Sequence, residues 1–353
     1  MRDKQVTIAA LPGDGIGKEV VPAAQEVLGA VAERYDIKIL WREYAWGVDY
    51  YRKHGRMMPI DALEILSPVD AIFLGAVGHP DVSDVETLWG MLIPIRREFD
   101  QYINLRPVRA LSGVEAPVMR SSEVDVVIVR ENVEGEYSSV GGRSYQGTPY
   151  EAAYQQSIFT RRGVERVARF AADLARKRSH RLTSATKSNG IIHTMPFWDE
   201  VVSSVLTEYQ DVKLSSVLID ALCASLVSSP ERHDVIVASN LFGDILSDIA
   251  AATVGSIGIA PSANLNPERR FPSMFEPVHG SAPDIAGRGI ANPIGQIWSG
   301  AMMLEHLGFA EAGRATIRAI ESVLARGIKT ADLGGLSSTA EVTAAVIGAV
   351  RED

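Results

Sequence analysis

Apolar and polar positions follow two different rhythms along the N-terminal part of the chain. Residues 6–11 form a short, continuous apolar run, which is typical of a buried strand, and residues 18–35 repeat apolar positions at helical spacing. Residues 12–17 between them are rich in glycine and predict a turn. Further apolar runs at 37–41 and 71–75 predict two more strands. This succession of strand, helix and strand indicates an α/β fold.

The same pattern continues through the rest of the chain. Residues 87–99 predict a helix that Pro94 disturbs, and residues 258–284, rich in Pro, Asn and Gly, predict long loops. A glycine-rich stretch at 138–148 followed by a strand at 154–159 predicts a hairpin arm, a common dimer device. The remaining predicted strands are 124–130, 182–186, 214–220 and 235–239, and the remaining predicted helices are 163–177, about 293–308 and two more at the C-terminus.

Length and composition narrow the class of protein. A chain of 353 residues is too long for one simple core and predicts two lobes. Hydrophobic residues make up 46% and charged residues 22%, as in soluble globular proteins. The net charge of −9 argues against nucleic acid as a general partner, because DNA binding needs a basic face. Local basic clusters remain able to bind a small anion.

Three further features bear on the compartment. The apolar start at 6–11 is too short for a signal peptide, and no apolar run approaches the ~20 residues that span a membrane. A single cysteine, Cys223, excludes an internal disulfide and cysteine-based zinc or iron–sulfur sites. We therefore expect a cytoplasmic protein with no membrane partner.

The segment 240–248, with the sequence NLFGDILSD, is the most informative candidate site. It places Asp244 and Asp248 four residues apart in an otherwise apolar run. On a helix this spacing puts both carboxylates on one face, about 6 Å apart, where they repel each other unless a cation lies between them. Mn²⁺ or Mg²⁺ is the natural candidate, because hard divalent cations prefer oxygen ligands. The alternative is a pair of exposed aspartates on a solvated helix face.

Arg96, Arg106 and Arg130 are candidates for binding an acidic substrate. Each lies in an apolar or turn setting, not in a run of charges. Because the guanidinium fork binds carboxylates bidentately, three convergent arginines would indicate a di- or tricarboxylate. Three separate surface salt bridges are the alternative.

Two segments are candidates for binding a dinucleotide. The turn 13–17 lies between a predicted strand and helix, but its spacing is G-x-G-x-G, so a tight turn that lets the helix pack on the sheet is the alternative. In the loop 275–284, Asp284 is suited to accept hydrogen bonds from the two ribose hydroxyls of an unphosphorylated adenosine, and would repel a 2′-phosphate. His279 in this loop has a structural role as its alternative.

Tyr137 and Lys187 are the candidate acid and base. Lys187 follows a predicted strand and has small neighbours, and a lysine close to cations can titrate nearer neutral pH and act as a base. A solvated loop lysine is the alternative. Asp220, at the end of the predicted strand 214–220, is placed to supply a third carboxylate ligand. A carboxylate trio without histidine favours magnesium or manganese over zinc.

Taken together, these motifs resemble the β-decarboxylating dehydrogenases of 2-hydroxy acids, which include isopropylmalate, isocitrate, homoisocitrate, tartrate and D-malate dehydrogenases. The resemblance implies a two-domain α/β fold with a large mixed sheet, not a classical Rossmann fold. The first domain would contain residues 1–100 and 255–353, and the second residues 101–254 with a dimer arm near 137–160. The resemblance covers essentially the whole chain and is most specific in the segments 11–17, 240–248, 279–284 and 291–293.

The resemblance also implies roles for individual residues. Arg96, Arg106 and Arg130 would bind the substrate carboxylates, with Tyr137 as general acid and Lys187 as general base. Because Lys187 reaches the partner subunit's site in this family, an active homodimer is implied. The metal ligands for Mn²⁺ or Mg²⁺ would be Asp220, Asp244 and Asp248, with Asp220 supplied by the partner. The residues that bind NAD would be Asn189, Glu276, His279, Gly280, Ser281, Ala282, Asp284 and Asn292. A requirement for K⁺ is also plausible for the family.

The choice of substrate is expected to depend on the helix before Arg96. Isocitrate enzymes typically carry serine or threonine six residues before that arginine and asparagine four before it, where this chain has Gly90 and Leu92. The bulky Trp89 suggests a small substrate, and the surrounding segments look most like the enzymes acting on tartrate and D-malate. Isopropylmalate is the alternative substrate, and a non-catalytic anion-binding protein is the remote alternative. The family chemistry is oxidation at C2 followed by loss of the C3 carboxylate as carbon dioxide.

Overall fold

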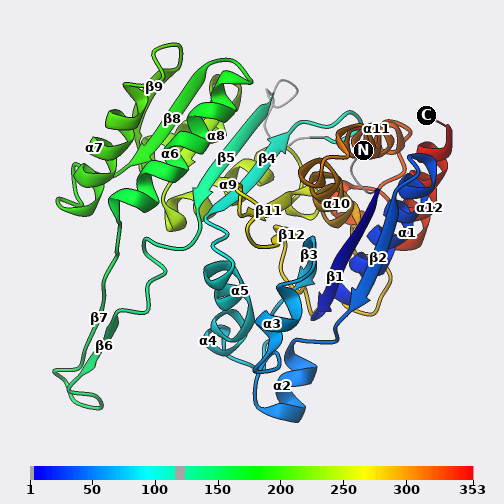
Figure 1. The fold of residues 1–353 in the computed structure, drawn as a ribbon, viewed down its shortest axis with the longest axis horizontal. Coiled ribbons are helices and arrows are strands. Elements are labelled where there is room, and N and C mark those ends of the chain that lie inside the picture. The colour runs from blue at the N-terminus through cyan, green and yellow to red at the C-terminus, as the bar shows by residue number, and fades with distance from the viewer. Residues whose placement is uncertain (1–3, 116–123, 353) are drawn as a thin grey trace.

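One ten-stranded mixed sheet forms the centre of this computed structural model, which describes residues 4–115 and 124–352 (Figure 1). The predicted α/β fold with a large mixed sheet is confirmed. The strands, in sheet order, are β2 (Lys38–Glu43), β1 (Gln5–Gly13), β3 (Ala71–Ala76), β12 (Ser273–Pro277), β11 (Pro261–Leu265), β4 (Ile103–Arg109), β5 (Asp125–Glu131), β10 (Val235–Ala238), β8 (Arg181–Thr186) and β9 (Lys213–Leu218).

Strand directions change in the middle of the sheet. The strands at either end are parallel, from β2 to β12 on one side and from β5 to β9 on the other. Between them, β12, β11, β4 and β5 pair antiparallel, so that Asn264 lies opposite Asn104, and Asn104 opposite Arg130. Strands from distant parts of the sequence therefore meet at the centre of the molecule.

Helices pack around both halves of this sheet. In Figure 1, α1, α10, α11 and α12 gather at one side, where both chain ends lie, and α6 to α9 surround the other. The helices are α1 (Gly17–Arg34), α2 (Val48–His54), α3 (Ala62–Leu66), α4 (Asp84–Thr87), the π-helical turn η1 (Leu88–Leu92), α5 (Ile93–Glu98), α6 (Arg161–Arg176), α7 (Thr194–Leu206), α8 (Ile219–Ser228), α9 (Asn240–Thr253), α10 (Ile294–Leu307), α11 (Ala310–Ala325) and α12 (Thr339–Glu352), with short 3₁₀ turns at Pro230–Arg232, Ile257–Ile259 and Ala331–Leu333.

The prediction of long loops at 258–284 is wrong, because this segment contributes β11 and β12 to the centre of the sheet. Each strand is only five residues long and every residue in it is buried. Prolines at their ends and the polar residues Ser262 and Asn264 within β11 mask the apolar pattern by which strands are recognised. Here the polar side chains are paired inside the protein and do not face water.

Two boundaries also differ from the sequence pattern. The hairpin arm exists and projects from the body in Figure 1, but its strands are β6 (Gly141–Ser144) and β7 (Ala152–Gln155), so the predicted strand 154–159 lies too far along the chain. Strand β9 ends at Leu218, and Asp220 therefore lies in the first turn of α8, not at the end of a strand. An acidic side chain is stabilised there by the positive end of the helix dipole.

The glycine-rich turn at the end of β1 contacts two distant segments of the chain. The amides of Asp14 and Ile16 donate to the carbonyls of Ala76 and Ser281, each at 2.8 Å. A Cβ at Gly15, whose φ is +52°, would lie 1.9 Å from the Ser281 oxygen. These amides are therefore occupied within the protein, which favours the tight packing turn over a phosphate-binding loop.

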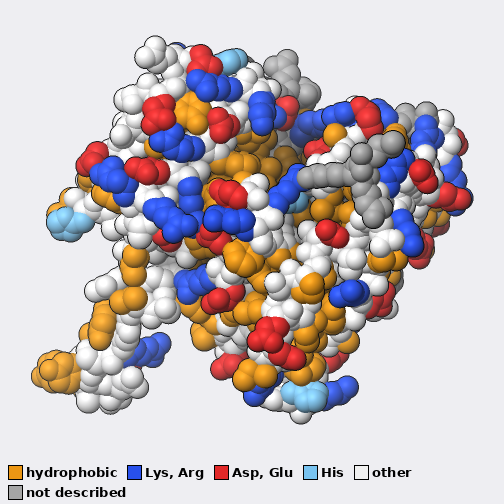
Figure 2. Space-filling model, viewed as in Figure 1, with side chains coloured by type: hydrophobic (Ala, Val, Ile, Leu, Met, Phe, Trp, Pro, Cys, Tyr) orange, Lys and Arg blue, Asp and Glu red, His pale blue; other side chains and the backbone are white. Residues whose placement is uncertain are grey.

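The surface shows no strongly basic face in the view of Figure 2, where Lys and Arg side chains are mixed with Asp and Glu. Hydrophobic side chains mark the tip of the arm in the same view, and Tyr145, Tyr150 and Tyr154 of the arm are exposed. Among the described residues, no helix is long and apolar enough to cross a membrane.

Candidate active site

A cavity of about 320 Å³ lies where the central strands meet α5 and α9. Residues from segments between positions 75 and 280, far apart in the sequence, line it. Nine of the residues selected from the sequence are among them: Trp89, Arg96, Arg106, Arg130, Tyr137, Asp244, Glu276, His279 and Gly280.

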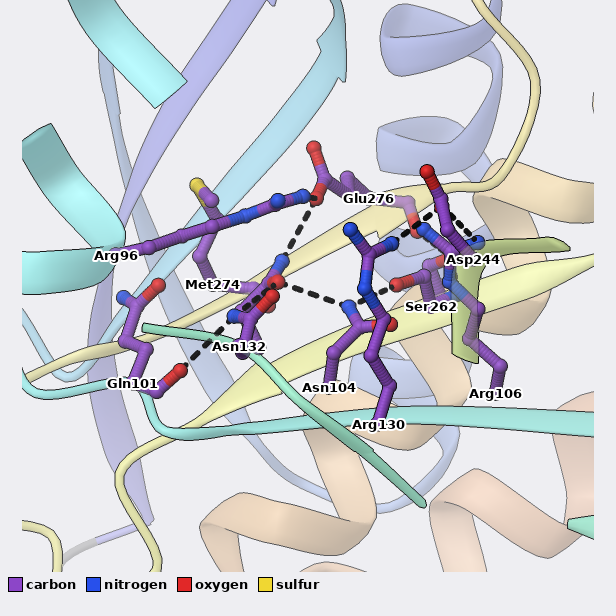
Figure 3. Close-up of polar contacts among 12 residues, drawn as sticks. Arg96, Gln101, Asn104, Arg106, Arg130, Asn132, Asp244, Ser262, Met274 and Glu276 are labelled. Atoms are coloured by element: carbon purple, nitrogen blue, oxygen red, sulfur yellow. Dashed lines mark hydrogen bonds and ion pairs between the residues drawn. The ribbon is translucent and has the colours of Figure 1, made fainter. Parts of the chain in front are cut away.

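The Asp244 carboxylate accepts hydrogen bonds from three side chains that line this cavity (Figure 3). Arg106 donates to its Oδ1 at 3.0 Å, and Arg130 makes a short ion pair with the same oxygen. The Tyr137 hydroxyl donates to Oδ2 at 3.0 Å. The predicted arginines Arg106 and Arg130 therefore converge, and they do so on a carboxylate of the protein itself.

Burial and neighbouring charges together set the pKa values of these groups. Burial alone would raise the pKa of Asp244, but Arg130 and Arg106 outweigh it and hold that pKa below its ordinary value. Burial and the Asp244 charge raise the pKa of Tyr137, so its hydroxyl keeps the proton. Burial raises the pKa of Asp248 against the opposing influence of Arg106.

Arg106 lies between the two helix aspartates. Its Nη1 is 3.0 Å from Asp244 Oδ1 and 3.7 Å from Asp248 Oδ1, and it donates to the Ser247 hydroxyl at 2.6 Å. The sequence argument that a cation must separate the two carboxylates is therefore met within the chain by a guanidinium. The half-buried helix α9 is as predicted, and both aspartates lie toward Arg106.

Arg130 is fixed by the first turns of α9. The Asn240 Oδ1 accepts hydrogen bonds from Arg130 Nε at 3.0 Å and Nη2 at 2.7 Å. The side chain crosses the helix at Gly243, where a Cβ would lie 2.6 Å from the Arg130 Cβ. The side chain of Arg130 is only 4% exposed, so its direction is set by these neighbours.

Arg96 has a different carboxylate partner, Glu276 on β12. The Arg96 Nη2 donates to Glu276 Oε1 at 2.7 Å, and Asn264 Nδ2 donates to the same oxygen at 2.7 Å. Asn104 and Asn132 each donate to Asn264 Oδ1 at 2.9 Å, which extends this buried network over β4, β11 and β12 and to the residue that follows β5 (Figure 3). The network thus fixes a predicted cofactor residue against a predicted substrate residue.

Lys187, Asp220 and Asn189 lie outside the cavity of their own chain. The Lys187 ammonium is 2.8 Å from Asp220 Oδ1, and this ion pair lowers the pKa of Asp220. The Asp220 side chain is 67% exposed, and Asn189 is also exposed. Within the described part of one chain, no group of three or more His, Cys, Asp or Glu side chains is arranged to hold a metal ion.

The loop after β12 presents a mixed set of cofactor candidates. His279 is buried, its Nδ1 donates to the Gly280 carbonyl at 3.0 Å, and its Nε2 has no hydrogen-bond partner among the described residues. Burial lowers the pKa of His279, so a neutral ring leaves Nε2 as an acceptor. An unpaired buried acceptor beside the cavity fits a bound ligand that donates a hydrogen bond.

The remaining cofactor candidates, Ser281, Ala282, Asp284 and Asn292, do not line the cavity. Ser281 and Ala282 are half-buried and Asp284 is exposed, as expected for residues that would meet a bound adenosine at the surface. Asn292 is occupied structurally, because its Oδ1 accepts from the Ile294 amide and its Nδ2 donates to Asp332, both at 3.0 Å.

Several residues that shape the site were not selected from the sequence. Asn240 lies four residues before Asp244, so helical spacing alone places it on the same face and identifies it as a neighbour. Arg97, which also lines the cavity, follows Arg96 directly. The amide chain of Asn104, Asn132 and Asn264 has no local signal, because its members lie on β4, directly after β5 and on β11, which pair only in the folded sheet.

The structure has a mixed α/β sheet with several arginines around one cavity, and comparisons with known proteins identify its family. Residues 7–346 match the model of the isocitrate/isopropylmalate dehydrogenase family, and the chain belongs to this family. Its members are oxidoreductases that act on CH–OH groups and generally use NAD and a divalent metal ion.

Individual relatives agree with this assignment. The chain is 54% identical over 354 residues to the probable tartrate dehydrogenase/decarboxylase of Bacillus subtilis (strain 168), covering 100% of both chains. It is 54% identical over 353 residues to the D-malate dehydrogenase (decarboxylating) of Escherichia coli (strain K12), covering 97% of this chain and 98% of that one. The crystal structure of isocitrate dehydrogenase from Methylococcus capsulatus superposes with a TM-score of 0.89 at 33% identity, covering 98% and 99% of the two chains.

Replacing Gly243 with alanine is expected to displace Arg130, because the added Cβ would lie 2.6 Å from Cβ and 2.7 Å from Cγ of that arginine. We expect Gly243→Ala to destabilise the protein by about 1–3 kcal/mol in denaturant unfolding and to lower dehydrogenase activity. Gly29→Ala is the matched control, because Gly29 also lies in a helix but has nothing within 4 Å of the added Cβ. Equal effects of the two substitutions would contradict this account of Gly243.

Glu131 is expected to make stability depend on pH. It is buried at the end of β5, accepts the amides of Val133 and Glu134 at 3.0 and 2.9 Å, and burial raises its pKa to about 7. The folded state therefore holds the proton of Glu131 more tightly than the unfolded state does. The resulting contribution to the free energy of unfolding is fully present below about pH 4.3 and is lost as pH rises to about 7.

Chemical unfolding of Glu131→Gln between pH 4 and 8 tests this linkage. We expect the variant to gain stability relative to the parent as pH rises, by on the order of 3 kcal/mol across the range. Any hydrogen bonds that the glutamine amide fails to make would shift the whole curve of unfolding free energy against pH, but would not change its slope. Glu26→Gln, an exposed position on α1, is the control, and a parallel pH course of parent and Glu131→Gln would refute the effect.

Proposed function

We propose that this protein oxidises and β-decarboxylates D-malate or tartrate, with NAD as hydride acceptor and Mn²⁺ or Mg²⁺ as cofactor. The observation that carries the proposal is the cavity in which Arg96, Arg106 and Arg130 converge beside Tyr137 and Asp244. A pocket with this density of guanidinium groups is suited to a small dicarboxylate. The two relatives of 54% identity, named for tartrate and D-malate, support that choice of substrate.

The part of the cavity wall that η1 contributes supports a compact substrate. Trp89 and Leu92 line the cavity, so the wall is bulky and apolar where an isocitrate carboxylate would require hydrogen-bond donors. Gly90 is not among the lining residues, and a Cβ there would lie 2.9 Å from the Met57 Cγ. A donor at position 90 would therefore meet Met57 before it met the substrate.

The arginines would bind the two carboxylates and hold C2 and C3 in place. In the free chain, Asp244 occupies Arg106 and Arg130, and Glu276 occupies Arg96. A bound dicarboxylate would offer the same guanidinium groups equivalent oxygen acceptors. The exchange keeps each buried charge paired, which avoids the cost of an isolated one.

Tyr137 and Lys187 would move the protons. Lys187, reaching the cavity from the partner subunit, would take the proton of the C2 hydroxyl as hydride leaves for NAD. Tyr137 would return a proton to C3 after the carboxylate there departs as carbon dioxide, and its raised pKa keeps that proton available.

The donor set fits a divalent metal only when two chains combine. Asp244 and Asp248 are on one helix face, and Asp220 is exposed beside Lys187 on another surface, from which these last two residues would both reach a partner's site. When bound there, the metal ion would supply Lewis-acid polarisation of the C2 oxygen. The active form would therefore be a homodimer that shares its sites.

Substrate preference is tested by a panel of D-malate, meso-tartrate, isopropylmalate and isocitrate, with NAD and Mn²⁺ present. We expect catalytic efficiency with D-malate or tartrate to exceed that with the larger acids by at least about tenfold, because Trp89 restricts the pocket. Isopropylmalate as the best substrate would replace this proposal with its alternative. Asp244→Asn is expected to abolish turnover, and near-normal turnover would remove Asp244 from the metal site.

Sharing of the site is tested by mixing two inactive homodimers, Lys187→Met and Asp244→Asn. If the partner supplies Lys187, each heterodimer contains one site with both lesions and one intact site. Random subunit exchange should then restore about a quarter of the parental activity. If each chain used its own Lys187, every site in the mixture would carry a lesion and no activity would return.

A further inference from the structure

Arg97 makes two contacts that join the substrate pocket to the Tyr137 loop. Its guanidinium carbon lies 4.9 Å from the centroid of the Trp89 ring, a stacked cation–π arrangement. Its Nη2 donates to the Tyr137 carbonyl oxygen at 2.7 Å. All three side chains line the cavity, so one cation connects the pocket wall to the backbone of the acid.

Arg97 differs from the other arginines of the cavity in its partners. Arg96 is paired with Glu276, and Arg106 and Arg130 are paired with Asp244. In the described part of the chain, no carboxylate lies within salt-bridge distance of Arg97. Its position is therefore set by the stack on Trp89 and by the single carbonyl of Tyr137.

The π-helical turn η1 explains how Trp89 and Arg97 face the same way. Residues eight apart on a regular α-helix point about 80° away from each other. Pro94 has no N–H to donate to the Gly90 carbonyl, and the wider π turn occupies this position. Because this turn closes over five residues and is wider than an α-helical turn, it brings positions 89 and 97 closer in direction, and their side chains are in contact.

Tyr137 depends on such contacts because it lies in neither a helix nor a strand. Its hydroxyl is held by Asp244 at 3.0 Å and its ring lies 5.6 Å from the Arg130 guanidinium carbon. The Arg97 hydrogen bond fixes the backbone at the other end of the same residue. The donor and the acceptor of this bond come from α5 and from the segment after β5, which are forty residues apart in sequence.

We propose that Arg97 is a positioning residue for the Tyr137 proton donor, and that Trp89 is the support on which it rests. The inference depends on the role of Tyr137 in the proposed function. In that step the Tyr137 O–H bond breaks and a C–H bond forms at C3 from the enolate electron pair, which leaves a phenolate that water reprotonates. Arg97 takes no part in hydride transfer and does not bind the substrate carboxylates.

Single and double variants separate positioning from direct binding. Arg97→Met keeps the length of the side chain but removes the fork and the stacking plane, and Tyr137→Phe removes the proton donor. We expect Arg97→Met to lower kcat by about ten- to a hundredfold, as a misplaced catalytic group does, with little change in KM. Because Arg97 acts through Tyr137, the double variant should turn over no more slowly than Tyr137→Phe alone.

Single-turnover NADH formation separates loss of positioning from a general structural defect. A general defect would slow NADH formation, whereas a misplaced Tyr137 would not. Hydride transfer precedes protonation, so its rate in Arg97→Met should stay within about twofold of the parent. The proposal would be overturned if the kcat losses of Arg97→Met and Tyr137→Phe multiplied in the double variant. It would also be overturned if Arg97→Met slowed the single turnover and raised KM. Normal turnover of Tyr137→Phe would instead refute the proposed acid, which keeps the two failures distinguishable.

Further variants guard against a folding defect. Trp89→Leu keeps the Arg97 residue but removes the ring on which its guanidinium rests, and should slow the protonation at C3. A change in KM without a fall in kcat would contradict this role of Trp89. Arg176→Met is the matched control, because Arg176 also stacks on an aromatic ring, 4.4 Å from the Tyr209 centroid, but lies outside the cavity. It should keep parental kcat, and an equal loss there would attribute the Arg97 effect to lost stacking in general.

Discussion

The need to neutralise buried guanidinium groups governs the arrangement of this site. Arg106 and Arg130 have side chains only 8% and 4% exposed, and both bind Asp244. Removing one member of a buried ion pair typically costs about 3–5 kcal/mol, because the other is left uncompensated. The surroundings of Asp244 follow from this requirement. Asn240 accepts hydrogen bonds from Arg130, and Gly243 leaves room for the Arg130 side chain. The Tyr137 hydroxyl donates to the second oxygen of the Asp244 carboxylate.

The mixed sheet provides the place where such a site can form. Its antiparallel centre brings β12, β11, β4 and β5 together, and these strands carry polar residues inward that would be unusual in the middle of a parallel sheet. Asn104 and Asn132 both donate to Asn264 there, and Asn264 donates to Glu276, which also accepts from Arg96. These hydrogen bonds set side chains from distant segments at fixed positions before any ligand binds, although the Oδ1 atoms of Asn104 and Asn132 have no partner among the described residues.

The sequence was sufficient for the parts of this structure that have a local signal. The α/β class and the Asp244 helix follow from periodicity, spacing and residue type, whereas the pattern left open whether Arg106 and Arg130 converge. The strands β11 and β12 could not be recognised, because their buried residues include Ser262 and Asn264, which in sequence look like a loop. The partner of each arginine was also hidden, since Arg96 and Glu276 are 180 residues apart and meet only through the sheet.

The charge pairs of the free chain also bear on how ligands would bind together. Asp244 cannot direct Oδ1 at both arginines and also give the same lone pairs to a divalent cation. On the proposed chemistry, a cation that draws Asp244 and Asp248 toward itself would leave Arg106 and Arg130 without their acceptor. A substrate carboxylate would then restore the pairing, so each ligand would favour binding of the other. Such coupling is reciprocal by thermodynamic necessity, and it requires no conformational change larger than the exchange of ion-pair partners.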